Sequence, residues 1–513
     1  MNSRSTSPPE WTGRTGSFEP AGLAILLGEW ASGPGTLSVR LSSALARLLD
    51  RGEISAGARL PSERALASAL AVSRTTIVAS YEELRQKGRV ESRQGSGTRV
   101  LPQDGGAWLS RARTDPGAGE GDAGHGMLNP VLRALTEEHS PGAVSFVAAH
   151  LPGAEEFLAE AFTRSRRQLS ALSRHHGYMP LGLPALRAGL ARQLSDRGLP
   201  TREEEILVTN GAQQAIALVI SLLLSPGDEV IVEDPTYPGA IDLFGSARLR
   251  MTPVPPAAEP GAVERIAAAL RRPRAKLLYL QPTFHNPTGA VLPERQRREI
   301  ARLAEQSGVA ILEDHTLADL SLGAAPPPPI AAFAKRGTVL TVASLSKLYW
   351  GGLRIGWVRA PEGLLHRLGR RKAMEDLGSS LPGQMMAVQL LEKRAAVADL
   401  RRRQVEQRLD ALARGLARRL PDWTWKRPAG GLTLWVRLPR GQGSEFAQVA
   451  SRHGVSVLPG PVCSPTNTFA DHLRLAFVPE PEEIAEGVDR LARAWEKYAA
   501  GRDAARARVR VIV

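Results

Sequence analysis

Short β-rich runs alternate with helical stretches through the long part of the chain between residues 141 and 495. The runs read EEILVT, DEVIVED, AKLLYLQP, VAILED, GTVLTVAS and RIGWVRA, and the first of them leads into the helical stretch AQQAIALVISLLL. Strands separated by helices form a mostly parallel sheet through right-handed crossovers. Ligands of such a sheet bind at the carboxyl ends of its strands. We therefore expect an α/β domain here, with its reactive side chains directly after the runs.

The segment TVASLSKLYWGGLRIGW contains one lysine, Lys347, between two serines and followed by an arginine. An amine held in a mostly apolar pocket loses its proton more easily, and it can then form a Schiff base with an aldehyde. Ser344, Ser346 and Arg354 carry groups that bind a phosphate. An ordinary surface turn of the same composition is the alternative, so this interpretation depends on the other runs.

Three other runs end in side chains that suit the same site. After ILVT, Gly211 permits a tight turn, and the amides of Gly211, Ala212 and Gln213 open a helix whose positive end attracts phosphate. Tyr237 follows DEVIVED. Its ring either lies flat on the ring of a ligand, such as a pyridine, or packs in the core. Asp314 ends VAILED, where a carboxylate against a pyridine nitrogen keeps that nitrogen protonated.

The N-terminal part of the chain, from Thr36, predicts three helices and a hairpin. LSVRLSSALARLLDRG places its leucines on one helical stripe that ends at Gly52. LPSERALASAL begins with Pro61 and Ser62, which supply helix-start chemistry, and Ser73 can cap the third helix, SRTTIVASYEELRQKG. Two β segments joined by RQGSG make a wing. This succession is the winged helix-turn-helix arrangement, whose third helix enters the major groove of DNA.

Charge supports a polyanionic partner for this N-terminal part. The formal net charge of the whole chain is +14, for which an arginine-rich genome composition is an equally good explanation. Residues 40–100 hold eleven Arg or Lys against six Asp or Glu. The third helix begins with Arg74, Thr75 and Thr76, side chains that read bases or bind phosphates. A solvated helix face is the alternative for any one of them.

Cysteine content and apolar runs exclude several classes of protein. Cys463 is the single cysteine, so we expect no internal disulfide and no metal site. No apolar run approaches the roughly 20 residues that cross a bilayer, and the polar N-terminus lacks the apolar core of a signal peptide. The sequence therefore predicts a cytoplasmic protein without a membrane segment.

Two sets of motifs resemble known families. The order LPSERALA, VSRTTI, YEELRQKG and RQGSGTRV is similar to the GntR-type winged helix-turn-helix, and SLSK followed by GLRIGW resembles the lysine segment of fold-type-I aminotransferases, which use pyridoxal 5'-phosphate (PLP). A chain that carries both resembles the MocR/GabR family of transcriptional regulators, over most of residues 36–495. The resemblance implies a winged helix-turn-helix and an α/β PLP-dependent transferase fold, with a mostly parallel sheet and a smaller C-terminal α/β subdomain.

The resemblance implies a role for each matching residue. Lys347 would hold PLP, Tyr237 would stack on its ring, and Asn286 of HNPTG would hydrogen-bond its phenolic oxygen. Tyr178 would reach the phosphate bound by a partner chain, with a locally packed ring as the alternative. Arg474 of HLRLAFV would bind the carboxylate of an amino acid, although arginine is abundant in this chain. The implied DNA contacts are Arg64, Ser73, Arg74, Thr75, Thr76, Gln94 and Gly95.

One residue departs from the aminotransferase pattern. The tyrosine expected two positions after Asp314 is Thr316, which is too short to copy the phenol contact. Asn286 would then act alone, which weakens the expectation of full transamination. The presence of Asn286 favours an enzyme-like pocket, because many regulators of the family lack this asparagine.

The expected function is transcriptional regulation by a PLP-dependent, DNA-binding protein that senses an amino acid or an amine. The alternatives are a working aminotransferase with an appended DNA-binding head, and a regulator whose effector is PLP itself. The resemblance also implies a head-to-tail homodimer on double-stranded operator DNA. The effector, the operator and the target genes do not follow from the sequence. The expected parts are a disordered or weakly ordered extension (1–35), the winged helix-turn-helix (36–101), a linker (102–140), the aminotransferase-like domain (141–495) and a basic tail (496–513).

Overall fold

The computed structural model of the chain describes residues 18–31, 34–93, 97–101, 142–174, 176–335 and 339–510. It divides into two compact units, one comprising residues 1–130 with 444–452 and the other residues 131–443 with 453–513. The expected linker (102–140) and the expected wing contacts Gln94 and Gly95 lie outside the described residues.

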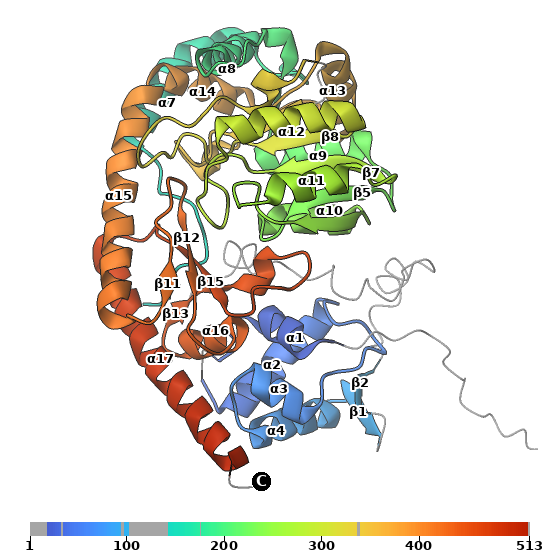
Figure 1. Cartoon of the computed structure of the whole chain (residues 1–513), viewed down its shortest axis with the longest axis vertical. Coiled ribbons are helices and arrows are strands. Elements are labelled where there is room, and N and C mark those ends of the chain that lie inside the picture. Colours follow the sequence, from blue (N-terminus) through green and yellow to red (C-terminus); the bar gives the residue numbers. More distant parts are fainter. Residues whose placement is uncertain are drawn as a thin grey trace, which may run out of the picture. The chain divides into compact units, whose positions relative to one another are not determined.

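The first unit is a winged helix-turn-helix, which confirms that part of the predicted fold class (Figure 1). The side chain of Ser62 accepts a hydrogen bond from the amide of Ala65, and Ser73 accepts one from the amide of Thr76, so both serines cap helices. Leucines of the predicted stripe are buried together with Ile77. The elements are α1 (Pro20–Leu27), α2 (Leu37–Asp50), α3 (Glu63–Ala69), α4 (Arg74–Gln86), β1 (Val90–Arg93) and β2 (Gly97–Val100).

Helix α1 differs from the expectation of a weakly ordered stretch over residues 1–35. Leu23, Leu26 and Trp30 are buried in the same core as the other helices of the first unit. The sequence PAGLAILL is apolar on every side, so it lacks the polar–apolar period that identifies a helix in a sequence. The unit also includes most of α16 (Gly443–Arg452), where Gln448 accepts a hydrogen bond from Trp30 Nε1 at 2.9 Å.

The second unit is built on a seven-stranded sheet with the strand order β4-β10-β9-β8-β7-β5-β6. Strand β10 runs antiparallel to both of its neighbours, and the other pairs are parallel, so the predicted mostly parallel sheet is confirmed. The strands are β4 (Ile206–Thr209), β5 (Glu229–Glu233), β6 (Arg250–Val254), β7 (Ala275–Leu280), β8 (Ala310–Asp314), β9 (Val339–Ser344) and β10 (Gly356–Arg359).

Helices cover this sheet. Ile216, Phe244 and Leu368 share one apolar core with the strands, and they come from α9, α10 and α13 respectively. Helices α11 and α12 lie side by side in front of the sheet in Figure 1. The helices of the unit are α7 (Glu155–Leu172), α8 (Pro184–Asp196), α9 (Ala212–Leu223), α10 (Pro238–Ser246), α11 (Ala262–Leu270), α12 (Glu294–Ser307), α13 (Glu362–Asp376), α14 (Leu381–Glu392), α15 (Arg394–Arg419) and α17 (Pro481–Arg510).

A smaller antiparallel sheet follows in the C-terminal part of the second unit, in the order β11-β12-β15-β14. This is the smaller subdomain that the fold class includes. Its strands are β11 (Thr424–Trp425), β12 (Thr433–Arg437), β14 (Leu458–Pro459) and β15 (His472–Ala476), and the short parallel pair beside it is β3 (Val144–Ser145) with β13 (Val455–Ser456).

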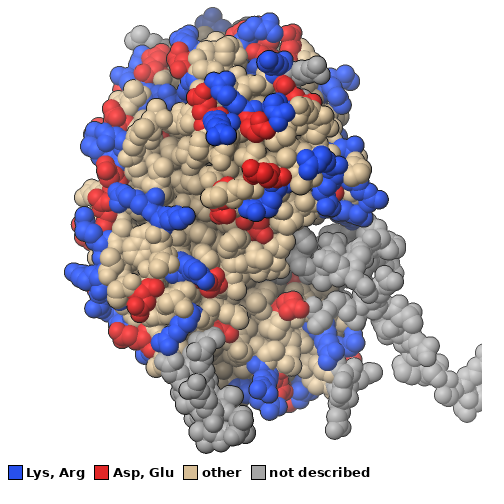
Figure 2. Space-filling view, in the orientation of Figure 1, with Lys and Arg blue, Asp and Glu red and all other residues tan. Residues whose placement is uncertain are grey.

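Charge and apolarity of the described residues add two findings. Figure 2 shows Lys and Arg side chains interspersed with Asp and Glu over the face in view, so the net positive charge is not gathered in one patch there. Among the described helices, none is long and apolar enough to cross a membrane.

Candidate functional site

Lys347 lies just after strand β9, and its Nζ donates a hydrogen bond to the backbone oxygen of Ala149 at 2.7 Å. Burial, with smaller contributions from the positive charges of Arg474 and Arg354, lowers the pKa of this amine to about 8, and the charge of Asp314 opposes the decrease. The neutral amine is the nucleophilic form. Lys347 therefore has a far larger reactive fraction near neutral pH than an exposed lysine has.

Asp314 ends strand β8 and is 3% exposed. Its Oδ2 accepts hydrogen bonds from Tyr279 OH at 3.0 Å and from Gln281 Nε2 at 3.4 Å, and its Oδ1 accepts one from the amide of Thr316 at 2.8 Å. Burial and the charge of Asp314 raise the pKa of Tyr279, which keeps its hydroxyl protonated as a donor. The carboxylate is thus fixed from the neighbouring strand β7.

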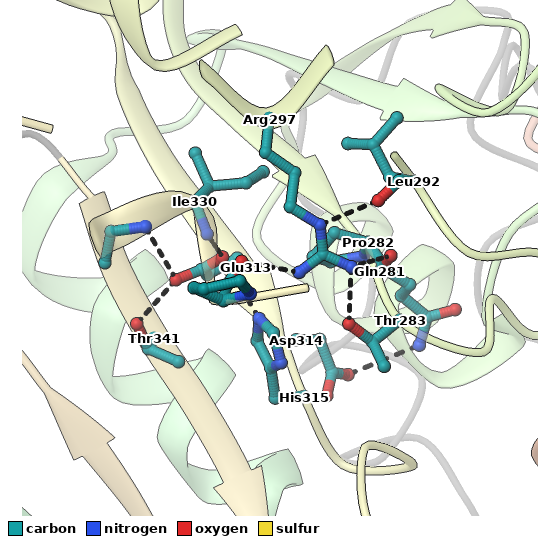
Figure 3. A network of polar contacts seen from close by, with 12 residues as sticks. Gln281, Pro282, Thr283, Leu292, Arg297, Glu313, Asp314, His315, Ile330 and Thr341 are labelled. Atoms are coloured by element: carbon teal, nitrogen blue, oxygen red, sulfur yellow. Dashed lines mark hydrogen bonds and ion pairs between the residues drawn. The ribbon is translucent and has the colours of Figure 1, made fainter. Parts of the chain in front are cut away.

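A buried polar network fixes the end of β8 behind Asp314 (Figure 3). Burial would raise the pKa of Glu313, but the charge of His315 and hydrogen bonds from His315 and Thr341 lower it more, so Glu313 stays ionised. The amides of Ile330 and Ala331 also donate to this carboxylate, at 2.7 and 3.1 Å. The guanidinium of Arg297, fully buried in the same network, donates to Pro282 O, Thr283 Oγ1 and Leu292 O at 2.6, 2.8 and 2.8 Å.

A turn suited to a phosphate opens helix α9. Gly211 is the N-cap of α9 with φ +90°, a conformation that favours glycine. Arg354 Nη2 donates to Asn210 O at 2.7 Å, and a Cβ added to Gly211 would lie 3.1 Å from that nitrogen. The hydroxyls of Ser344 and Ser346 are hydrogen-bonded to each other at 2.9 Å. Backbone amides, a guanidinium and two hydroxyls are therefore available for one anion.

Arg474 lies on β15 and is 1% exposed. Its Nη1 is 3.4 Å from Asn286 Oδ1, and its Nη2 hydrogen-bonds the backbone oxygen of Val147. Burial raises the pKa of Tyr237 to about 12; the Asp314 charge contributes to the increase and the Arg474 charge opposes it. These electrostatic effects show that Tyr237, Asp314 and Arg474 lie close to one another.

The structure brings together most of the residues predicted from the sequence. Electrostatic interactions link five of the predicted side chains: Lys347, Asp314, Arg354, Arg474 and Tyr237. Asn286 contacts Arg474, and the hydroxyl of Tyr237 donates a hydrogen bond to Gln213 Oε1 at 3.2 Å.

Tyr178 is the exception among the predicted pocket residues. It is 60% exposed, and its ring stacks on His176 with the centroids 6.1 Å apart. Within the described part of this chain, no hydrogen bond joins its side chain to the pocket.

The groups of this pocket fit PLP. Thr236 Oγ1, Thr316 Oγ1 and Arg474 Nε are buried and have no hydrogen-bond partner among the described residues, as expected for a polar site that a ligand completes. The cofactor also needs an amine for its aldehyde, an anion for its pyridine nitrogen and donors for its phosphate. Lys347, Asp314 and the turn at Gly211 meet these needs in that order.

Sequence reasoning missed several residues that hold the site in place. Tyr279 and Gln281 stand in the run AKLLYLQP, and pairing β7 with β8 would have placed them beside Asp314. The amide side chains of Asn210 and Gln214 donate to Asp376, which is more than 160 residues away in sequence. No local signal in the sequence connects these three.

In the first unit, the predicted DNA contacts lie at the start of α4. Ser73, Arg74 and Thr75 are exposed, and Thr76 is partly buried. The guanidinium of Arg74 donates to Glu63 Oε2 from Nε at 3.1 Å and from Nη2 at 2.9 Å. Arg64, on α3, is also exposed. The helix start thus offers hydroxyls and a guanidinium to a partner outside the unit.

A winged helix-turn-helix and a pocket of aminotransferase type in one chain define a two-part, DNA-binding regulator. Residues 37–100 match the family described as "Bacterial regulatory proteins, gntR family", and residues 150–491 match "Aminotransferase class I and II", a family that binds PLP. The chain belongs to the family in which these two parts are fused, the MocR type of transcriptional regulator.

Known proteins support this assignment along most of their length. The chain is 30% identical to YisV of Bacillus subtilis, named as an HTH-type transcriptional regulator, over 75% of this chain and 80% of that protein. It is 28% identical to the probable rhizopine catabolism regulatory protein MocR of Rhizobium meliloti, over 80% and 83%. The crystal structure of LysN, an alpha-aminoadipate aminotransferase from Thermus thermophilus, is 31% identical with a TM-score of 0.65 and covers 72% of this chain and 95% of that one.

Proposed function

We propose that this regulator holds PLP on Lys347 and changes its binding to operator DNA when an amino acid or an amine enters the pocket. The observation that carries the proposal is the reactive amine of Lys347, whose pKa of about 8 results from burial beside Arg474 and Arg354. An amine of this kind has no role in a simple DNA-binding protein.

Each residue of the pocket has a role in this proposal. Asp314 would accept a hydrogen bond from the protonated pyridine nitrogen, Tyr237 would cover the ring, and Asn286 would donate a hydrogen bond to the phenolic oxygen. The α9 amides of Gly211, Ala212 and Gln213 would bind the phosphate, together with Ser344, Ser346 and Arg354. If bound there, PLP would supply an aldehyde that can condense with the amine of Lys347 or with the amine of an effector.

Arg474 selects the class of effector. A buried guanidinium binds a carboxylate through two parallel hydrogen bonds, and this favours amino acids over simple amines. Its Nε is a buried donor without a partner among the described residues, so a carboxylate would satisfy it.

A homodimer is part of the proposal. Tyr178 reaches the phosphate in the partner chain, and its neighbourhood carries exposed apolar side chains. Met374 and Leu377 are 75% and 51% exposed, and the backbone of Gly378 lies directly against Met179. Exposed apolar residues grouped in this way favour burial against a second protein surface. A head-to-tail pairing presents two winged helix-turn-helix units to one operator.

The effector needs only a modest coupling to the DNA-binding units. A difference of roughly 1–3 kcal/mol between the effector-bound and effector-free states changes operator affinity by about 5- to 150-fold.

Transamination is the second candidate function. The firmly held Asp314 favours it, because a carboxylate at the pyridine nitrogen strengthens the cofactor as an electron sink, and the presence of Asn286 also favours it. Thr316 opposes it, because its hydroxyl cannot replace the phenol expected at that position.

One set of measurements separates the candidates. The purified chain is incubated with PLP, amino acids and a keto acid, and its operator affinity is measured in parallel. A spectral change without turnover, together with altered operator affinity, supports the sensor. Many turnovers per site and an unaltered operator affinity support the enzyme. An affinity that responds to PLP alone identifies PLP as the effector.

Lys347→Ala provides the test of the cofactor anchor. We expect borohydride treatment of the native chain with PLP to add one pyridoxyl mass to the peptide that contains Lys347. The variant should fold and take up no such mass. A native chain that takes up none would contradict the proposal.

A further inference from the structure

An ion pair between a buried lysine and a partly buried aspartate lies next to the turn that opens α9. Lys372 and Asp376 are one turn apart on α13, and Lys372 Nζ lies 2.6 and 2.8 Å from the two carboxylate oxygens of Asp376. The side chain of Lys372 is 0% exposed. A buried charge is tolerated only when it is paired and hydrogen-bonded, so Lys372 requires Asp376 in this position.

Asp376 also connects this ion pair to the turn after β4 through hydrogen bonds. Its Oδ2 accepts hydrogen bonds from Asn210 Nδ2 and Gln214 Nε2, both at 2.8 Å, and its Oδ1 accepts one from the amide of Gly378 at 2.9 Å. Burial raises the pKa of Asp376, but hydrogen bonds from Gln214, Lys372 and Gly378 lower it more, so the carboxylate stays ionised. An ionised acceptor makes each of these bonds stronger than a neutral one.

Asn210 and Gln214 enclose the residues assigned to the phosphate. Gln214 Oε1 accepts a hydrogen bond from the amide of Asn210 at 2.8 Å, and Asn210 O accepts the bond from Arg354. Gly211 has little freedom between them, because a Cβ at Gly356 would already lie 2.5 Å from the Gly211 backbone. The first amides of α9 and the guanidinium of Arg354 are therefore both positioned through Asp376.

The same carboxylate is connected to the segment of Tyr178. Gly378, whose amide donates to Asp376, has φ +133°, and a Cβ there would lie 2.8 Å from Met179 O. Met179 O accepts a hydrogen bond from the amide of Gly182 at 3.0 Å, which closes the turn after Tyr178. Asp376 therefore holds both the turn proposed to bind the phosphate in this chain and the segment of Tyr178, which is proposed to reach the phosphate in a partner chain.

We propose that Lys372 and Asp376 are positioning residues for the phosphate group of the cofactor. They touch no cofactor atom; they hold the turn at Asn210 to Gln214, and through it Arg354, in the geometry that receives a phosphate dianion. The inference rests on the proposed function, because it assumes that PLP is the ligand.

The test uses the full chain, freed of cofactor, and two ligands that differ only in the phosphate. Asp376→Asn keeps the shape of the side chain and removes its charge. The double variant Lys372→Met with Asp376→Leu removes both charges, and replacing a buried ion pair by apolar residues of similar volume preserves folding in other proteins. Glu294→Gln, which breaks an exposed i, i+4 pair on α12, is the matched control. Far-UV circular dichroism selects the folded variants.

Each folded protein is titrated with PLP and with pyridoxal, which lacks the phosphate. We expect both variants to lose affinity for PLP by about tenfold or more, because hydrogen bonds to an ionised group are worth that much. Their affinity for pyridoxal should match that of the native chain and of Glu294→Gln.

Two results would overturn the inference. One is unchanged PLP affinity in the folded double variant. The other is an equal loss for PLP and pyridoxal, which indicates a general structural role of the pair. A native chain that binds neither ligand would instead refute the proposed function, and this is established before any variant is compared.

Discussion

The pKa of Lys347, about 8, sets the pH range in which the pocket can take up an aldehyde. Only the neutral amine attacks, so the rate of covalent PLP attachment should rise with pH up to about 8 and level off above it. Below that pH the rate should fall by about tenfold per pH unit, since the neutral fraction falls in that proportion. Stopped-flow absorbance over a series of buffers measures the profile.

An N-acetylated lysine amide in the same buffers is the control for this profile. Its amine keeps an ordinary pKa near 10.4, so its rate should continue to rise well beyond the point at which Lys347 levels off. The ratio of the two rate profiles cancels the pH dependence that comes from the ionisation of PLP itself. Identical profiles would contradict the lowered pKa.

Arg474→Lys tests the selection of carboxylates. A lysine keeps the positive charge but loses the fork of donors that matches a carboxylate. We expect affinity for an effective amino acid to fall by about tenfold or more, because a bidentate charged pair is lost. Affinity for the decarboxylated amine should change little. Spectral titration of the PLP-loaded chain measures both, and a parallel loss for both ligands would remove Arg474 from this role.

Pocket residues that follow a strand were accessible to sequence reasoning, and residues that support them were not. Lys347 and Asp314 stand at strand ends, where a parallel sheet concentrates its ligands. Asp376 stands at the end of a helix, and its partners Asn210 and Gln214 follow a strand far away in sequence. Only the packing of α13 beside α9 brings these three together, and a sequence has no local pattern for that packing.

Helices α3 and α4 place an acidic side chain against the predicted DNA contact. Arg74 is 72% exposed and forms its ion pair with Glu63 of α3. Arg74→Ala should weaken specific operator binding by roughly 1–3 kcal/mol. Glu63→Gln should leave binding equal or tighter, because the guanidinium no longer has to leave a carboxylate before it binds DNA. Quantitative footprinting at constant salt measures both.

The salt dependence identifies the kind of contact that Arg74 makes. Loss of a phosphate contact weakens binding to all sequences alike and reduces the salt slope by about 1, whereas loss of a base contact relaxes specificity at one position. Arg64→Ala on the neighbouring helix gives a comparison within the same unit. Footprints identical to the native one in both arginine variants would exclude this helix start from the interface.

Helices and strands with a clear pattern of apolar residues were predicted from the sequence, and those without such a pattern were not. Strand β6 is the missing strand of the large sheet, and it pairs with β5 alone at the edge of the sheet. Its sequence, RMTPV, contains Pro253, which argues against a central strand but is tolerated at an edge. Helix α1 was missed because it is apolar all round. In both cases the tertiary environment decides the structure.

At the scale of the whole molecule, the proposed dimer predicts complementation between two defective chains. Tyr178→Ala removes the side chain offered to the partner, and Lys347→Ala removes the anchor in its own pocket. Each pure variant should incorporate little PLP at low cofactor concentration. A mixed dimer contains one pocket with Lys347 from one chain and Tyr178 from the other, so it should recover incorporation in one of its two pockets.

Borohydride reduction followed by mass analysis of the Lys347 peptide measures this recovery. Mixing Tyr178→Ala with native chain at the same total concentration is the control for dilution. Additive incorporation, with no gain on mixing, would show that each pocket is complete within one chain. Sedimentation of the mixture establishes that subunits have exchanged.

Two donors of the pocket, the amine of Lys347 and the guanidinium of Arg474, hydrogen-bond the backbone oxygens of Ala149 and Val147. In the proposed function PLP occupies the amine of Lys347 and a carboxylate occupies Arg474, so the two carbonyls of this short stretch would lose these donors, and main-chain oxygens in that condition must find water or new donors. This stretch lies close to residue 142, where the described part of the second unit begins. Filling the proposed pocket would therefore change the hydrogen bonding of the main chain at Val147 and Ala149.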